Sequence, residues 1–140
     1  MSDLLEAAKN AVRLAQKKGA QEASAGAYRS RDVEVGWRDG KVEKVSEATT
    51  RGISVALYVD GRYSAVSSSD LRPDALEKFI EESVAMARTL AKDPFRKLPD
   101  PKLYEGRSTA DLMTSDPKAR DVTPAQRKQL AEALQMLRSL

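Results

Sequence analysis

The sequence predicts an α+β fold in which two long helices cover one face of an antiparallel sheet, and three observations support this prediction. Apolar residues recur at helical spacing near the N-terminus and again after Arg72. Between these segments, two Asp-Gly pairs each separate alternating apolar and polar runs. The order of one helix, a meander of strands and a second helix is typical of a sheet covered on one side. We expect four to five strands, then a Pro-rich linker and a C-terminal helix.

The first helix is predicted over residues 3–18. Ala8, Ala11 and Ala15 recur on one side of this segment, while charged residues fall on the other side. Gly19 suits the left-handed conformation that ends many helices. An apolar face made largely of alanine lets a helix approach a sheet closely, so this helix is expected to form part of the core.

Two tight β-hairpins are predicted at Asp39-Gly40 and Asp60-Gly61. Asp and Gly tolerate the positive φ that both central residues of a type I′ turn require. A two-residue loop also fixes which residues face each other across the strands. Counting outward from the second turn pairs Val59 with Arg62, Tyr58 with Tyr63, Leu57 with Ser64 and Val55 with Val66.

The remaining strands are less strongly marked. Residues 21–30 are predicted as a first, separate strand, which Gly26 weakens. Counting from the first turn places Trp37 opposite Val42. These segments bring the expected number of strands to four or five.

The second hairpin presents two different faces. The side that we expect to be buried carries Ile53, Val55, Leu57, Val59 and Val66. The opposite side carries small residues together with Tyr58, Tyr63 and Ser67, which are candidates for contact with a peptide or a partner protein. Ordinary cross-strand packing is the more frequent explanation of such a tyrosine pair, so both explanations stay open.

After the strands, the sequence divides into three further parts. A helix is predicted from Pro73 to Asp93-Pro94, and it completes an α+β domain over residues 1–92. Residues 93–122 hold four of the six prolines and are predicted to be a linker or a strap. Residues 123–140 are predicted to be a C-terminal helix that runs to the last residue without a stop signal, as a truncated helix would, with an apolar stripe of Leu130, Ala133, Leu134, Leu137 and Leu140.

Composition excludes several classes of chemistry for this chain alone. It contains no cysteine and no histidine, so disulfides, thiolate sites, Ser-His catalysis and histidine metal ligands cannot be built from it. No run is long enough for a membrane span and no leader pattern begins the chain, so a cytoplasmic protein without a membrane partner is expected.

Charge gives little support for nucleic-acid binding. The 24 basic and 21 acidic residues are interleaved, which indicates a mixed solvated surface. Double-stranded-RNA-binding domains share the order of one helix, strands and one helix, but they use a lysine cluster where their second helix starts. Here that place is the nearly neutral segment from Asp70 to Asp74, so a nucleic-acid partner is not expected.

The sequence resembles the first domain of the TldD/PmbA family over about residues 4–104. No single motif carries the resemblance, which depends on many short matches in order. They are Lys17-Lys18-Gly19-Ala20, Glu22-Ala23, Gly40-Lys41-Val42-Glu43, Ser46-Glu47, Arg51-Gly52-Ile53, Asp60-Gly61-Arg62, Ser68-Ser69-Asp70-Leu71, Pro73-Asp74-Ala75-Leu76, Ala85-Met86-Ala87-Arg88, Asp93-Pro94 and Leu98-Pro99-Asp100. The stretch from Leu98 to Tyr104 resembles the PmbA (TldE) branch more closely.

The resemblance implies a part in a peptide-processing zinc metalloprotease. TldD and PmbA are similar to each other and form a heterodimer in which TldD carries a His-Glu-x-x-x-His zinc site in its later portion. The family is linked to proteolysis, peptide-antibiotic maturation and modulation of DNA gyrase inhibitors. Its chains are much longer than this one, and the zinc motif matches no position here. The resemblance therefore implies that zinc, if needed, belongs to a TldD-like partner subunit or to a missing C-terminal domain, and that this chain alone is inactive.

Three function classes follow for this chain. The first is the noncatalytic N-terminal part of a TldD/PmbA-like protease subunit that contributes peptide recognition or subunit pairing. The second is a free-standing protein-interaction module of the same fold. The third, a nucleic-acid-binding domain, is supported only by a pI of about 9.2.

Overall fold

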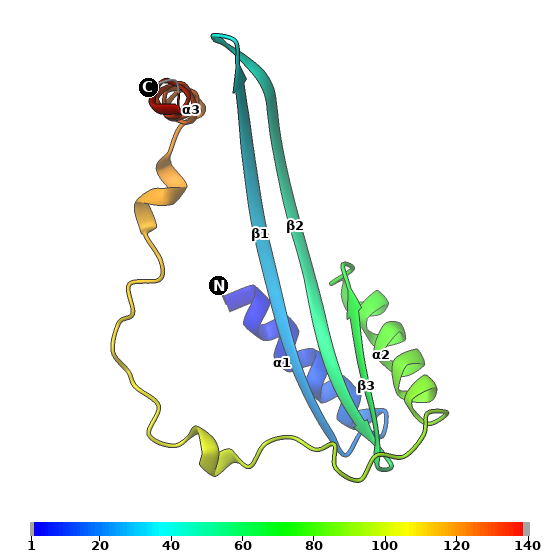
Figure 1. Ribbon diagram of the computed structural model, residues 1–140. Helices are drawn as coiled ribbons and strands as arrows, with labels where there is room; N and C mark the ends of the chain where they lie inside the picture. Colours follow the sequence, from blue (N-terminus) through cyan, green and yellow to red (C-terminus); the bar gives the residue numbers. More distant parts are fainter. Residues whose placement is uncertain (1, 139–140) are drawn as a thin grey trace. The chain divides into compact units, whose positions relative to one another are not determined.

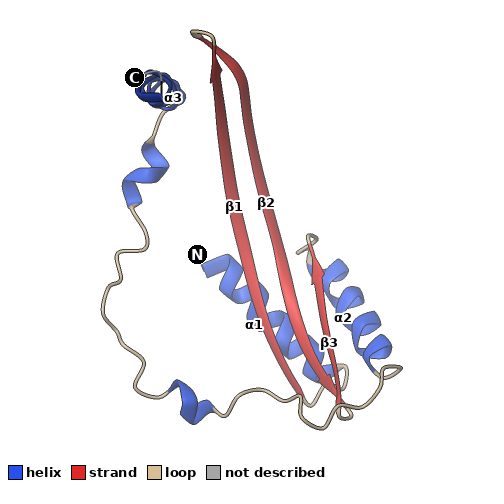
Figure 2. Ribbon diagram, viewed as in Figure 1, coloured by secondary structure: helices blue, strands red, loops and turns tan. Residues whose placement is uncertain are grey.

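The computed structural model describes residues 2–138 and confirms the α+β class. Its elements are α1 (Ser2–Lys17), β1 (Glu22–Arg38), β2 (Lys41–Val59), β3 (Arg62–Ser68), α2 (Pro73–Ala87) and α3 (Pro124–Arg138) (Figure 1). Two short 3₁₀ helices, Pro101–Tyr104 and Pro117–Asp121, interrupt the long loop between α2 and α3 (Figure 2). The strands form one antiparallel sheet in the order β1-β2-β3.

The sheet has three strands, so the prediction of four to five was wrong. The predicted first strand and the first arm of the Asp39-Gly40 hairpin are one continuous strand, β1. The second arm of that hairpin likewise continues into the next predicted strand as β2. Neither junction contains proline or an Asp-Gly pair, and β-branched Thr49 and Thr50 favour extended backbone. Without turn residues, the chain has no local reason to reverse.

Gly52 does not interrupt β2, because it has a packing role there. A Cβ built at Gly52 would lie 2.8 Å from the hydroxyl oxygen of Tyr28. The missing side chain thus lets the ring of Tyr28 lie directly on the backbone of β2. This contact joins β1 and β2 within the sheet.

The chain divides into two compact units. Unit 1 comprises the described residues up to Ser30 together with Thr50–Glu105. Unit 2 comprises Arg31–Thr49 together with the described residues from Gly106 onward. Unit 1 thus contains α1, α2, β3 and the adjoining parts of β1 and β2, while unit 2 contains the Asp39-Gly40 hairpin and α3.

The core of unit 1 lies between the sheet and both of its helices, as predicted. Its fully buried side chains are Ile53, Val55, Leu57 and Val59 from β2, Leu76, Ile80, Val84 and Ala87 from α2, and Ala11 and Ala15 from α1. Val66 of β3 is partly buried against this cluster. Both helices therefore cover the same face of the sheet (Figure 1), and burial of each large aliphatic side chain contributes about 1.5–3 kcal/mol.

The second hairpin has the predicted register. Val59 pairs with Arg62, Tyr58 with Tyr63, Leu57 with Ser64 and Val55 with Val66. Asp60 and Gly61 have φ of 50° and 73°, and Asp39 and Gly40 have φ of 49° and 74°. Both Asp-Gly pairs therefore adopt the two positive φ angles of a type I′ turn.

The predicted end of the second helix was wrong. Helix α2 stops at Ala87 and does not continue to Asp93-Pro94. The hydroxyl and the N–H of Thr89 both donate to the carbonyl of Met86, and the Arg62 side chain donates to the carbonyl of Leu90 at 2.8 Å. The bonds from Thr89 satisfy a carbonyl of the last helical turn, and the bond from Arg62 satisfies a carbonyl beyond the helix end, without another helical turn.

Helix α3 begins as the sequence predicts. The Thr123 hydroxyl accepts from the Gln126 N–H at 3.3 Å, and the Gln126 side chain accepts from the Thr123 N–H at 2.8 Å. This reciprocal pair is a capping box. Leu130, Leu134 and Leu137 are mostly exposed, while Leu140 lies outside the described residues.

Candidate peptide- and partner-recognition surface

The sheet of unit 1 leaves the face opposite its helices uncovered over a shallow groove of about 450 Å³. We call this surface the open face. It is lined by Ser24, Gly26, Ser54, Val55, Ala56, Tyr63, Ala65, Val66 and Ser67. Because most of these residues are small, the backbone of the sheet is accessible to another chain. Of the three predicted contact residues, Tyr63 and Ser67 line this groove.

Tyr58 lies beside the groove and packs on Tyr63. The two residues pair across β2 and β3, and their ring centroids are 5.2 Å apart with an interplanar angle of 55°. Burial raises the pKa of the Tyr58 hydroxyl, and the neighbouring Tyr63 and Glu22 raise it further. The tyrosines therefore form one aromatic cluster at one side of the open face.

A cation covers one side of this cluster, which the sequence did not indicate. The guanidinium carbon of Arg96 lies 4.6 Å from the centroid of the Tyr63 ring, a cation–π contact. Arg96 also pairs with Asp93 at 3.5 Å. The chain after α2 thus limits how much of Tyr63 another molecule can reach.

Two hydrogen bonds donated by backbone N–H groups hold this segment against β1 and the second hairpin. The N–H of Asp93 donates to the carbonyl of Gly61 at 2.8 Å, and the N–H of Leu98 donates to the carboxylate of Glu22 at 3.1 Å. Asp93-Pro94 suggested only the end of a helix in the sequence, because a contact to a distant turn has no local pattern. The segment therefore forms one border of the open face.

Both outer edges of the sheet carry no further strand among the described residues. The order β1-β2-β3 places β1 at one edge and β3 at the other. In the register set by the Asp60-Gly61 turn, the backbone N–H and C=O groups of Tyr63, Ala65 and Ser67 point away from β2, toward the outer edge of the sheet. An added strand beside β3 could therefore use the backbone of the same residues whose side chains lie on the open face.

The turn residues differ in what they contact. Asp60 exchanges two hydrogen bonds with Gln21: its N–H donates at 2.7 Å, and its carboxylate accepts at 3.1 Å. Asp60 also lies 3.7 Å from the guanidinium of Arg88. Asp39 and Gly40, at the other turn, are exposed. We interpret all four turn residues as determinants of the fold.

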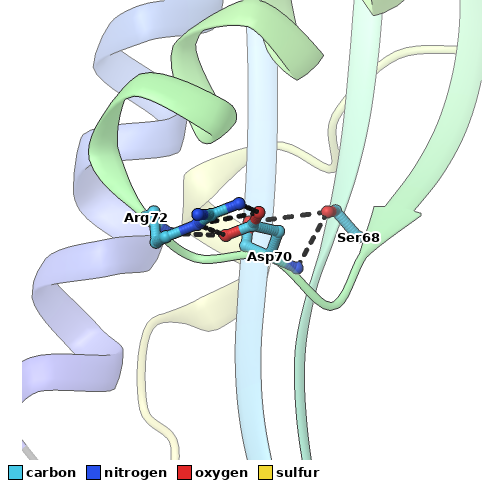
Figure 3. Close-up of polar contacts among 3 residues, drawn as sticks. All are labelled: Ser68, Asp70 and Arg72. Carbon is cyan, nitrogen blue, oxygen red and sulfur yellow. Dashed lines mark hydrogen bonds and ion pairs between the residues drawn. The ribbon is translucent and has the colours of Figure 1, made fainter.

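The hydroxyl-rich stretch at the end of β3 leads into α2 through a turn. The N–H of Asp70 donates to the Ser68 hydroxyl at 3.1 Å (Figure 3). The Asp70 carboxylate accepts from both the backbone N–H and the guanidinium of Arg72 (Figure 3). Because its acceptor atoms serve this turn, Asp70 has a structural role.

Acid should weaken this turn, and Asp70→Asn should remove part of that acid sensitivity. The hydrogen bonds from the Arg72 side chain and backbone lower the pKa of Asp70 from 3.8 to about 2. A carboxylate with a lowered folded-state pKa stabilises the fold above its unfolded pKa, and this stabilisation is lost as the pH falls from about 4 to about 2. Thermal unfolding followed by circular dichroism should show a smaller loss of Tm between these pH values in the variant. Arg72→Gln should give a smaller reduction, because the backbone N–H of residue 72 still donates to the Asp70 carboxylate. Unchanged acid sensitivity in both variants would contradict the assignment.

The carboxylates of α2 that could have suggested a metal or acid-base site form ion pairs instead. Lys18 lies 3.2 Å from Glu77 and 2.7 Å from Glu81, which raises the pKa of Lys18 and lowers the pKa of Glu81. Among residues 2–138, no cluster of three or more His, Cys, Asp or Glu residues is placed to hold a metal ion. The described residues of this chain therefore offer no set of side chains that fits zinc.

None of the described helices is long and apolar enough to span a membrane.

Comparison with known proteins gives one family. Residues 23–87 match the profile described as PmbA/TldA metallopeptidase domain 1. The chain is 28% identical over 100 residues to the metalloprotease PmbA of Escherichia coli O157:H7, which covers 71% of this chain and 22% of that protein.

Two solved structures resemble the chain. One is a candidate modulator of DNA gyrase from Bacteroides thetaiotaomicron, with a TM-score of 0.86 and 34% identity over 92% of this chain and 29% of that one. The other is TldE from Thermococcus kodakarensis, with a TM-score of 0.72 and 19% identity over 95% of this chain and 29% of that one, a likeness of fold. The chain therefore spans less than a third of the length of each of these relatives.

Proposed function

Since this chain contains an N-terminal domain of the TldD/PmbA family, we propose that it supplies a noncatalytic surface for peptide recognition or subunit pairing in a zinc metalloprotease. The observation that carries the proposal is the open face, where a groove floored by small residues lies beside an edge strand without a strand partner among the described residues. An extended peptide can add to such an edge through main-chain hydrogen bonds, which give affinity with little sequence preference. A protease that acts on varied unfolded peptides needs this kind of tolerance.

The chemistry of bond cleavage would then be provided by other residues. This chain has no histidine or cysteine from which to build a zinc site. The zinc would belong to a TldD-like subunit or to a later domain, and the substrate would be an unstructured peptide. We accordingly assign Tyr63 and Ser67 as contact residues, and Tyr58 as the residue that supports Tyr63 from β2.

Peptide binding to the open face can be tested by nuclear magnetic resonance. An unstructured peptide titrated into the ¹⁵N-labelled chain should shift the amide signals of β3. Ala65→Arg should weaken this binding by about tenfold or more, because the new side chain fills the groove. Ala85→Arg is the matched control, since Ala85 is exposed on α2 and lies outside the groove.

The same titration distinguishes addition of a strand from contact with side chains alone. A peptide that is N-methylated at alternate residues loses main-chain donors, so it should bind β3 more weakly than its unmodified form. If the β3 amides stay in place at millimolar concentrations of unmodified peptide, the open face is not a peptide site. Subunit pairing would then be the remaining role, to be tested by co-purification of a larger subunit that contains His-Glu-x-x-x-His.

A free-standing interaction module is a second candidate, and one observation favours it. Leu130, Leu134 and Leu137 recur along α3 and are 59%, 62% and 67% exposed. An apolar stripe of this kind on a helix often contacts another protein. A native mass that corresponds to 140 residues would favour the module, whereas a coding region that continues into the later family domain would favour the protease subunit.

A further inference from the structure

A second groove lies within unit 2, apart from the open face. One wall consists of Val33, Val35 and Trp37 of β1, and the other includes Arg127, Leu130 and Leu134 of α3. The groove has a volume of about 560 Å³. This volume is in the range of sites that hold small ligands and short peptide segments.

Sequence spacing explains why these side chains line one groove. Val33, Val35 and Trp37 alternate along an extended strand, so their side chains lie on the same side of β1. Arg127, Leu130 and Leu134 are three and four residues apart, so they lie along one side of α3. Two regular elements therefore form the apolar walls.

The groove contains one charged side chain. Among the described residues, Arg127 is the only charged one in the lining, and none of the others forms an ion pair with it. By contrast, ion pairs on the neighbouring hairpin join Arg31 to Glu47, Glu34 to Lys44, and Arg38 to Glu43. Arg127 also lies near the N-terminal end of α3, where the helix dipole favours an anion. The site therefore combines apolar walls with attraction for one negative charge.

We propose that this groove binds the C-terminal end of an apolar peptide, with the α-carboxylate on Arg127 and the apolar side chains against Trp37, Leu130 and Leu134. Leu130 and Leu134 remain 59% and 62% exposed, so the groove is open along α3. An open groove leaves room for the branched side chains of a short peptide. A carboxylate held by a guanidinium accepts charge-assisted hydrogen bonds, which are stronger than neutral ones. The inference concerns unit 2 and does not depend on the proposed role of the open face.

Trp37 gives a direct measurement, because it is the only tryptophan in the chain. The probe is acetyl-Ser-Leu-Leu with a free carboxylate, compared with the same peptide as its C-terminal amide. Burial of the indole by the peptide should shift the Trp37 emission to shorter wavelength. The free acid should bind with a Kd about tenfold lower than that of the amide, as expected when a carboxylate gains hydrogen bonds from a charged donor.

Two charge variants separate the role of Arg127 from general attraction to a basic protein. Arg127→Gln should reduce the affinity for the free acid to that for the amide. Lys128→Gln removes the adjacent positive charge, which lies outside the groove, and should keep the tenfold preference within about a factor of two. Ala65→Arg on the open face should also leave this binding unchanged, so failure here and failure of the proposed function are distinguishable.

Several results would overturn the inference. Equal binding of acid and amide would remove the carboxylate contact, and unchanged Trp37 emission at millimolar peptide would remove the groove as a peptide site. Binding of decanoate without binding of the peptide would assign the groove to an alkyl carboxylate. A dimer in sedimentation experiments that Leu134→Asp dissociates would show that a second copy of the chain occupies the groove.

Discussion

Replacing Leu57 with Ala is expected to lower the free energy of unfolding by about 2–5 kcal/mol. Leu57 is 0% exposed near the C-terminal end of β2, where α1 and α2 both cover the sheet. Removal of its isobutyl group loses the burial of apolar surface and leaves a cavity that two helices and a strand cannot easily close. Urea unfolding followed by circular dichroism should show a lower midpoint with a similar slope.

Leu5→Ala provides the matched control for this cavity. Leu5 lies on α1 and is 56% exposed, so the same change of side chain should alter the stability by less than about 0.5 kcal/mol. Equal effects of Leu5→Ala and Leu57→Ala would show that the contact between sheet and helices does not determine stability. Trp37 fluorescence reports on unit 2 in the same experiment, so loss of unit 1 can be followed separately.

Ala15→Leu is expected to destabilise the chain by about 1–3 kcal/mol, although leucine is more apolar than alanine. Ala15 and Ala11 are both 0% exposed on the side of α1 that packs in the core. Small side chains set the close approach of this helix, and three added carbon atoms have no free volume to occupy. The helix must move away from the core or the side chain must adopt a strained rotamer.

Ala85→Leu tests whether this loss comes from the core. Ala85 is exposed on α2, and both residues have high helix propensity, so this substitution should change the stability by less than about 0.5 kcal/mol. Thermal and urea unfolding of the two variants should therefore differ clearly. An increase in stability for Ala15→Leu would indicate an unfilled cavity beside α1 and would contradict close packing there.

The parts of the fold that the sequence predicts are those determined by local geometry. The Asp60-Gly61 turn determines the residue pairs of the second hairpin, because each step outward from a two-residue loop adds one pair. The alanine face of α1 and the capping box at Thr123 are also local patterns. The strand count was wrong because residues 21–30 were expected to form a separate strand weakened by Gly26, whereas β1 and β2 each continue without a break. Gly52 accommodates Tyr28 from the neighbouring strand, a contact between distant positions in the sequence.

The candidate sites were predictable only in part for the same reason. Alternation along β2 and β3 places Tyr63 and Ser67 on the face away from the core, and both line the open face. The contact of Arg96 with Tyr63 and the hydrogen bond from Arg62 to the carbonyl of Leu90 depend on how distant segments meet. The groove beside Trp37 likewise requires α3 and the Asp39-Gly40 hairpin to lie together in unit 2. The residue spacing within α3 or within the hairpin does not indicate that these two segments lie together.

The division into units limits how this protein can be dissected genetically. The backbone passes between the units after Ser30, after Thr49 and after Glu105, so each unit is assembled from two separate stretches of the gene. A chain that ends after Glu105 would retain the residues of unit 1, but the hairpin segment Arg31–Thr49 would lack α3, the helix of unit 2. An autonomous unit 1 would instead require this hairpin segment to be removed and Ser30 to be joined to Thr50 through a short engineered turn. This design is feasible because β1 and β2 are neighbouring antiparallel strands.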